Sequence, residues 1–160
     1  MAGCACFGLI LFREAMMTEK AVDQLSIRAC RLEDIQRVLE LWRQAGATPS
    51  VTDTADDLRR AITECPAHVL VAEVEGRVVG SIIGAFDGWR GNIYRLAVHP
   101  DCRRQKIARA LVAEVEKRLA GQGAKRITAL VEKDQLRAMS FWEAVGYRVD
   151  ERMVRRVRTI

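Results

Sequence analysis

A cluster of basic residues in the stretch HPDCRRQKIARAL, residues 99–111, could bind an anion. The stretch joins a predicted strand to a predicted helix, so unpaired backbone N–H groups and the positive end of the helix dipole meet there. Such a point attracts phosphate, and the planar guanidinium group of arginine suits phosphate oxygens. An ordinary solvated basic loop is the alternative. The cations in question are Arg103, Arg104, Lys106 and Arg109.

Other machinery for chemistry is scarce in the sequence. There is no G-x-x-x-x-G-K-[ST] phosphate loop, and GQGAKR at 121–126 follows a predicted helix, which excludes a dinucleotide fingerprint. A G-x-S-x-G nucleophile motif is missing as well. Five scattered cysteines without a C-x-x-C pair, accompanied by two histidines, argue against a metal site and predict reduced thiols in the cytoplasm. We therefore expect simple transfer of a group between two bound partners.

The elements that must position these residues follow from hydrophobic periodicity and turn signals. Strands and helices follow one another in an α/β order around one mixed sheet. Glycines end three of the predicted helices, and a capping box at 54–57 begins the second helix. The predicted strands are 25–30, 68–74, 78–86, 92–98, 126–131, 147–149 and 152–159. The predicted helices are 32–45, a short helix that begins near residue 55, 107–120 and 135–145.

The size and charge of the chain limit its class. A chain of 160 residues fits one domain, which we expect over 21–160, with a disordered leader or a non-native start over 1–20. The opening run MAGCACFGLILF lacks a basic region and ends at Arg13, well short of a membrane span. The net charge of +5 mildly favours an anionic partner, but a solvated basic surface is the simpler explanation.

Two blocks of the sequence resemble the GNAT superfamily of N-acetyltransferases. YRLAVHPDCRRQKIARALVAEVEKRL is similar to the central block of that family, in which a strand leads into a Q/R-x-x-G-x-G/A loop and a helix. QLRAMSFWEAVGY is similar to the next block, usually N-x-x-A-x-x-L-Y-x-x-x-G-F. The resemblance implies a mixed, mostly antiparallel central sheet that is flanked by about four helices. It also implies that the sheet is splayed between two central strands, IYRLAV and ITALV.

The resemblance further implies transfer of an acetyl group from acetyl-CoA, the cosubstrate, to a primary amine. The backbone of the central strand would pair with the pantetheine arm as an added strand does, and the loop amides would hold the pyrophosphate. The implied cofactor-binding residues are Leu96, Ala97, Val98, Arg103, Arg104, Gln105, Lys106, Ile107, Ala108, Arg109, Gln135 and Trp142.

Lys106 stands where the family motif has its first glycine. If the loop uses right-handed dihedrals, the side chain points outward and the amide still binds phosphate. A left-handed lysine would instead cost roughly 1–2 kcal/mol and weaken cofactor binding. We expect binding to be retained, because Gln105, Ala108 and the other cations stay in place.

Trp142 replaces a tyrosine that the family commonly uses to protonate the departing thiolate. An indole N–H cannot act as a general acid near neutral pH, so that role does not transfer. A thiol with a pKa of about 8.5 leaves tolerably without help. We expect Trp142 to pack against the cofactor or in the core, and Gln135, which replaces an asparagine, to keep an amide contact to the cofactor.

Direct attack of the amine on the thioester carbonyl would place the oxyanion on a backbone N–H near Val98. Tyr94, on the strand that leads into the groove, is the preferred substrate-side residue, with a core aromatic as the alternative. Cys102 lies beside arginines, which would lower the pKa of its thiol. The candidates for a base are Asp87, Tyr94, His99, Glu132 and Tyr147, of which Asp87 and His99 suit turns equally well and Tyr147 suits the core.

Two other functional classes stay open at this point. A non-catalytic regulator of the same fold would bind acetyl-CoA and release no thiol with any amine. Nucleic-acid binding through the basic loop and RMVRRVR is disfavoured, because strand alternation spreads these arginines over two faces and stacking aromatics are few. We expect no membrane partner. The acceptor amine and a homodimer are left open.

Overall fold

The computed structural model describes residues 24–64 and 68–159. The leader or start predicted for residues 1–20 lies outside this part of the chain. The described residues form two compact units, one up to residue 128 and one from residue 129 onward, which are described in turn. Among the described residues, no helix is both long and apolar enough to cross a membrane.

A sheet with the strand order β1-β2-β3-β4-β5 forms the centre of the first unit. Its first four strands pair antiparallel with their neighbours, as expected for hairpins joined by short turns. Beside β4, the N–H of Gly91 donates to the carbonyl of Arg126 at 2.9 Å, just before β5 begins. The mixed, mostly antiparallel sheet is therefore confirmed, while its splay between β4 and β5 stays a prediction. The strands are β1 (Ser26–Ala29), β2 (His68–Val74), β3 (Arg77–Phe86), β4 (Gly91–Val98) and β5 (Ile127–Ala129).

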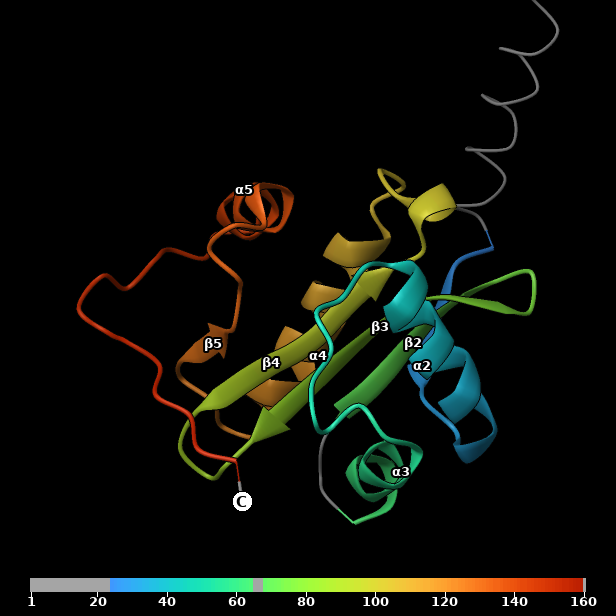
Figure 1. Ribbon diagram of the computed structural model, residues 1–160, viewed down its shortest axis with the longest axis horizontal. Helices are drawn as coiled ribbons and strands as arrows, with labels where there is room; N and C mark the ends of the chain where they lie inside the picture. The colour runs from blue at the N-terminus through green and yellow to red at the C-terminus, as the bar shows by residue number, and fades with distance from the viewer. Residues whose placement is uncertain (1–23, 65–67, 160) are drawn as a thin grey trace, which may run out of the picture. The chain divides into compact units, whose positions relative to one another are not determined.

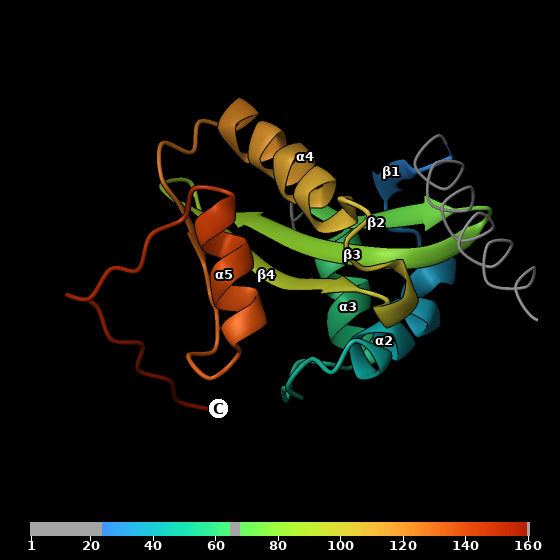
Figure 2. The same ribbon diagram turned by 90° about the horizontal axis from the view of Figure 1, so that it is seen from above.

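Three helices cover the two faces of this sheet. Figures 1 and 2 show α2 (Ile35–Gln44) and α3 (Ala55–Thr63) on one face and α4 (Ile107–Gly121) on the other. Successive residues of β3 alternate between these faces, because side chains along a strand point to opposite sides. The three helices confirm the predicted ones within one or two residues at most ends.

Glycines in β3 let α4 lie close to the sheet. A Cβ atom at Gly80 would lie 3.0 Å from Cδ1 of Leu111 and 3.1 Å from Cγ2 of Ile107. A Cβ atom at Gly84 would overlap the Cγ2 methyl group of Val115. An added Cβ atom at Gly80 would therefore press on the ends of two side chains, and one at Gly84 would force α4 to shift, because the helix packs directly on the strand backbone.

The opposite face of the sheet holds α2 through an apolar core and one polar contact. Trp42 is buried, and its indole Nε1–H donates to Oγ of the fully buried Ser81 at 2.9 Å. Asp34 is also fully buried before α2, where Arg28 donates to both of its carboxylate oxygens. Each of these buried polar groups thus has a partner, as stability requires.

The capping box predicted for α3 is present with one difference. Oγ1 of Thr54 accepts a hydrogen bond from the backbone N–H of Asp57 at 3.0 Å. The carboxylate of Asp57 in turn accepts from the Thr54 hydroxyl at 2.6 Å, whereas we expected it to reach the backbone. The N-terminus of α3 is capped in either case.

The second unit contains α5 (Leu136–Ala144), which confirms the predicted helix. Trp142 is buried and packs edge-to-face on Phe141 and Tyr147, with ring centroids 5.5 and 4.7 Å apart. The strands predicted at 147–149 and 152–159 are wrong, because the described residues after α5 form no strand. Their apolar side chains are exposed, for example Val154 at 76%. β-Branched residues favour a strand only where a neighbouring strand accepts their hydrogen bonds, so composition alone misled the prediction.

Candidate active site

A β-bulge interrupts β4 shortly before the basic loop. Ser81 of β3 pairs with Ala97, whereas Ile83 pairs with Tyr94, so one residue of β3 faces two residues of β4. Arg95, inside the bulge, has a left-handed backbone with φ 53°. Bulges of this kind re-aim side chains and occur often beside active sites. The bulge therefore lies on β4, the strand that is predicted to pair with the pantetheine arm.

The backbone beyond the bulge presents hydrogen-bonding groups on the edge of β4 that faces away from β3. The N–H of His99 donates to the carbonyl of Val79, next to β3, at 2.8 Å. Consecutive N–H groups of a strand point to opposite edges, so the N–H of Val98 points away from β3. Leu96, Ala97 and Val98 form one extended run at the end of β4. This run offers a ligand the edge that an added strand requires.

The loop between β4 and α4 takes a compact path with two left-handed residues. It begins with the short 3-10 turn η2 (Pro100–Cys102) and continues through Arg104 and Lys106, whose φ angles are 63° and 62°. Lys106 thus has a left-handed backbone, which glycine adopts without strain, and the right-handed alternative is wrong. Because the loop already has this shape, the cost falls on the stability of the free protein and not on binding.

Arg103 points into the first unit. Its Nη2 donates to the carbonyl of Ala45, after α2, at 2.8 Å, and its Nε donates to the carbonyl of Val98 at 3.4 Å. The guanidinium group therefore ties the loop to the end of α2, and it is the backbone of Arg103 that lies in the predicted phosphate loop.

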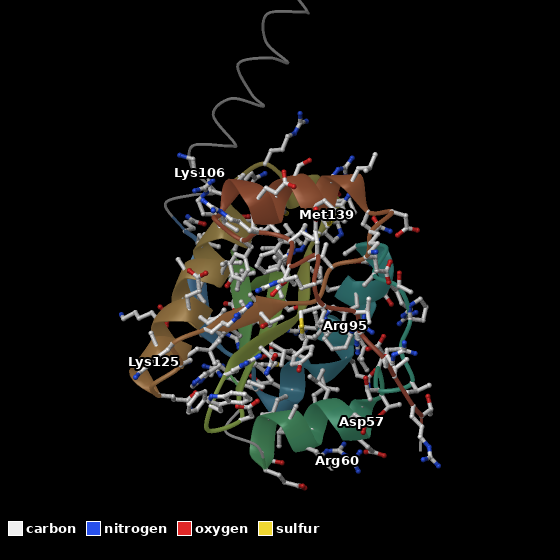
Figure 3. The ribbon with its side chains drawn as sticks, turned by 90° about the vertical axis from the view of Figure 1, so that its left-hand side faces the viewer. Asp57, Arg60, Arg95, Lys106, Lys125 and Met139 are labelled. Atoms are coloured by element: carbon white, nitrogen blue, oxygen red, sulfur yellow. The ribbon has the colours of Figure 1, made fainter. Side chains whose placement is uncertain are left out.

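The N-terminus of α4 directs its first amides into the same loop. The N–H of Ala110 donates to the carbonyl of Lys106, whereas the N–H groups of Ile107 and Ala108 lie in the first turn, where a helix provides no acceptor. The side chain of Ile107 is buried under the helix, and those of Lys106 and Arg109 are exposed. Figure 3 shows Lys106 at the end of the first unit remote from Asp57 and Arg60 of α3.

Two of the candidate bases form hydrogen bonds that stabilise turns. Asp87 accepts hydrogen bonds from the N–H groups of Trp89 and Arg90 at 2.8 and 2.7 Å, and these bonds lower the pKa of its carboxyl. Nδ1 of His99 accepts from the N–H of Asp101 at 3.3 Å and caps η2. Both residues therefore stabilise turns, which was the alternative for each.

The other candidates differ in their surroundings. Tyr94 is 38% exposed on β4, so it is not a core aromatic, and its place on the substrate side stays a prediction. In the second unit, Tyr147 packs on the ring of Trp142, and Glu132 lies in the turn before α5. Gln135 is the N-cap residue of α5, where its side chain makes no capping bond.

The expectation that nearby arginines lower the pKa of the Cys102 thiol is wrong. Its thiol is partly buried, and the loss of solvent raises its pKa more than nearby Arg77 lowers it. A raised pKa leaves less thiolate at neutral pH, which argues against a reactive cysteine.

Sequence reasoning missed Arg95 and its partners. Arg95 donates to the carbonyl of Thr48 at 2.8 Å and to Oδ2 of Asp53 at 2.6 Å, and its guanidinium lies 5.3 Å from the ring centre of Trp42. Nothing in the sequence indicates that the strand bulges at Arg95, so the direction of this side chain could not be predicted. The bulged strand, the left-handed loop and the helix N-terminus together fit a protein that holds a diphosphate-bearing ligand.

Comparisons with known proteins show which family the chain resembles. The sequence model of the acetyltransferase (GNAT) family matches residues 34–147. An acetyltransferase of Sodalis glossinidius is 38% identical over 127 residues, 79% of this chain and 89% of the relative. One from Pectobacterium atrosepticum is 37% identical over 123 residues, 77% of this chain and 87% of the relative. The PaiA N-acetyltransferase of Thermoplasma acidophilum, solved in complex with coenzyme A, has a TM-score of 0.71 at 19% identity and covers 79% of this chain and 91% of its own.

The chain belongs to the acetyltransferase (GNAT) family. Membership confirms the resemblance found in the two sequence blocks, together with the fold class and the enzyme class, an acetyl-CoA-dependent N-acetyltransferase. The match spans α2 through α5, so it includes β4, the basic loop and α4.

Proposed function

We propose that this enzyme transfers the acetyl group of acetyl-CoA to a primary amine by direct attack, in the cytoplasm. The neutral amine forms a bond to the thioester carbonyl carbon, the nitrogen gives up one proton to water, the C–S bond breaks, and CoA leaves as the thiolate, which takes up a proton from solvent. The acceptor is a peptide or protein N-terminus or a small-molecule amine. No covalent enzyme intermediate is needed, which agrees with the raised pKa of Cys102.

The course of the backbone from Val98 to Ala108 supports this proposal most strongly. The outward N–H of Val98 is suited to hold the oxyanion that forms when the amine attacks. The left-handed loop and the first turn of α4 then offer amides to the pyrophosphate, with exposed Arg104, Lys106 and Arg109 supplying positive charge. A single ligand with a thioester at one end and a diphosphate at the other would use both groups.

Removal of a proton from the amine limits the choice of acceptor. A lysine-type amine has a pKa of about 10.4 and is mostly charged at neutral pH, whereas a peptide α-amine has a pKa near 8. We assign the substrate side to Tyr94, because it is exposed on the strand that carries Val98. Its hydroxyl orients the amine or passes the proton to water.

A thiol-release assay with acetyl-CoA across a panel of amines tests this function. The panel should include a peptide α-amine, a lysine side chain, a polyamine and an aminoglycoside, and CoA binding should be titrated in parallel by thermal shift. We expect saturable CoA binding and thiol release with at least one amine. Binding without release would favour the non-catalytic regulator, and the absence of both would contradict acetyl transfer.

A further inference from the structure

The long connection between α2 and α3, residues 45–54, packs on the core at its start through Ala45 and Ala47 and then runs, largely exposed, to the bulge of β4. Most of its residues are exposed, and Val51 is 72% exposed. Local bonds shape one turn, in which the N–H of Ser50 donates to Asp53 and the N–H of Asp53 donates to the carbonyl of Ser50. Segments with so few buried contacts open easily unless other elements hold them. We call this segment the 45–54 loop.

Arg95 joins this loop to the bulge through two hydrogen bonds that span more than forty residues of sequence. Its Nη1 reaches the carbonyl of Thr48 and its Nη2 reaches Asp53, the residue that closes the turn. The two charged side chains are 18% and 20% exposed, so solvent screens their ion pair less than it screens a surface pair. A single guanidinium group therefore binds two points of the loop, and we call these two hydrogen bonds the Arg95 grip.

The guanidinium group is itself held in place by rigid neighbours. It lies over the ring of Trp42, whose indole N–H is bonded to the buried Ser81. Figure 3 shows Arg95 between α3, which carries Asp57 and Arg60, and the basic loop, which carries Lys106. The residue also keeps a left-handed backbone, a strain that persists only where the surroundings impose it.

A second arginine fixes the beginning of the same loop. Arg103 donates to the carbonyl of Ala45 at 2.8 Å and to the carbonyl of Val98 at 3.4 Å. The strand and loop proposed to bind acetyl-CoA thus hold the 45–54 loop at its start and near its end.

We propose that Arg95 is a positioning residue, which holds the 45–54 loop against the β4 bulge so that the loop places the acceptor amine beside the thioester. This inference rests on the proposed acetyl transfer. It assigns to Arg95 no contact with the reacting atoms and no part in holding the cofactor. Loss of the grip would therefore impair use of the amine and leave CoA binding intact.

Three variants test the grip from both sides. Arg95→Lys keeps the charge but cannot reach two acceptors with a planar fork, and Arg95→Asn removes the reach while tolerating a left-handed backbone. Asp53→Asn removes the charged partner. Arg90→Lys is the matched control, because Arg90 also stacks on a tryptophan, Trp89, but lies in the β3–β4 turn.

Amide hydrogen exchange of residues 45–54 is the first measurement. We expect exchange to become at least tenfold faster in all three variants and to stay unchanged in Arg90→Lys. Thiol release with the best amine of the panel is the second, and we expect the KM for the amine to rise at least tenfold. The Kd for CoA, measured by calorimetry, and the KM for acetyl-CoA should change less than twofold.

The results separate this inference from the proposed function. Unchanged exchange in the Arg95 variants would overturn the grip, and a parallel loss of CoA affinity would place Arg95 in cofactor binding instead. Equal losses for amine and acetyl-CoA, together with a lower Tm, would indicate a merely structural role and overturn the proposal. Absence of thiol release from the wild type would contradict the proposed function and the acceptor role with it, and exchange would then decide only whether Arg95 holds the loop.

Discussion

Individual residues near the site adopt backbone conformations that are uncommon for residues other than glycine. Lys106, at the position where the motif has a glycine, adopts a left-handed backbone with φ 62°, and Arg104, at a variable position of the motif, is left-handed too, with φ 63°. The sequence identified Lys106 as a departure, but either backbone was compatible with it. Nothing in the sequence indicated the direction of the Arg95 side chain, because the bulge that sets this direction depends on the pairing of β4 with β3.

Substitution of Lys106 by glycine should stabilise the protein. Removal of the Cβ atom relieves the left-handed strain, so we expect the free energy of unfolding to rise by about 1 kcal/mol. Urea unfolding measures it. Because the loop already has its binding shape, the Kd for CoA should change by less than about threefold, the loss of one cation being a small term beside the amides.

Lys117→Gly is the control for this prediction, since Lys117 is an exposed residue within α4. The same change there should lower the free energy of unfolding by about 1 kcal/mol. A large gain in CoA affinity in Lys106→Gly would show instead that the lysine side chain obstructs the site.

At the scale of elements, hydrophobic periodicity predicted the helices and strands that pack on the core, and it failed for the C-terminal segment, whose described residues are largely exposed. The helices were found because each buries one apolar face. The β2–β3 hairpin was found from its two β-branched runs on either side of a turn, in which Glu75 and Gly76 are both left-handed. The C-terminal strands were predicted from composition alone, and the described residues there pair with no strand. β5 is shorter than predicted for the same reason.

Close packing of α4 on β3 predicts a strong effect of one methyl group. Gly84→Ala would drive the new Cβ atom into Val115, so we expect a loss of about 2 kcal/mol in the free energy of unfolding. Gly121→Ala, at the end of α4, meets nothing within 4 Å and should be neutral or stabilise by up to about 1 kcal/mol. Chemical denaturation of both variants checks this, and equal stabilities would show that α4 can shift away from the strand.

At the scale of the whole molecule, the order of the elements could be predicted, and the contacts between distant segments could not. The order of strands and helices, together with the two motif blocks, was enough to identify the family and the sheet. The long-range ion pairs were not predictable, because each joins residues about forty positions apart. Arg28 with Glu73 and Arg95 with Asp53 are examples.

Acid should unfold the protein in part through Asp34. Hydrogen bonds from Arg28 lower the pKa of this buried carboxyl, whose side chain is 1% exposed. A lowered folded-state pKa contributes stability that is complete above the unfolded pKa of about 3.9 and is lost as the pH falls through the folded pKa. The free energy of unfolding of the wild type should therefore fall steeply below about pH 4.

Asp34→Asn tests this assignment. We expect it to lower the free energy of unfolding by about 3 kcal/mol at pH 7, because Arg28 loses its buried partner, and to flatten the fall at acid pH. Asp56→Asn is the control, since Asp56 is 81% exposed in its pair with Arg59. Parallel pH curves for the wild type and Asp34→Asn would contradict the role of Asp34.

The glycines of β3 also fix where α4 can stand along the sheet. The side chains of Ile107 and Leu111, near the start of the helix, pack over Gly80, and that of Val115, further along, packs over Gly84. Sliding the helix by one turn, about 5.4 Å, would bring bulky residues of β3 under these side chains. The helix is therefore locked in register, and its outer face can be extensively redesigned without displacing the amides at its tip.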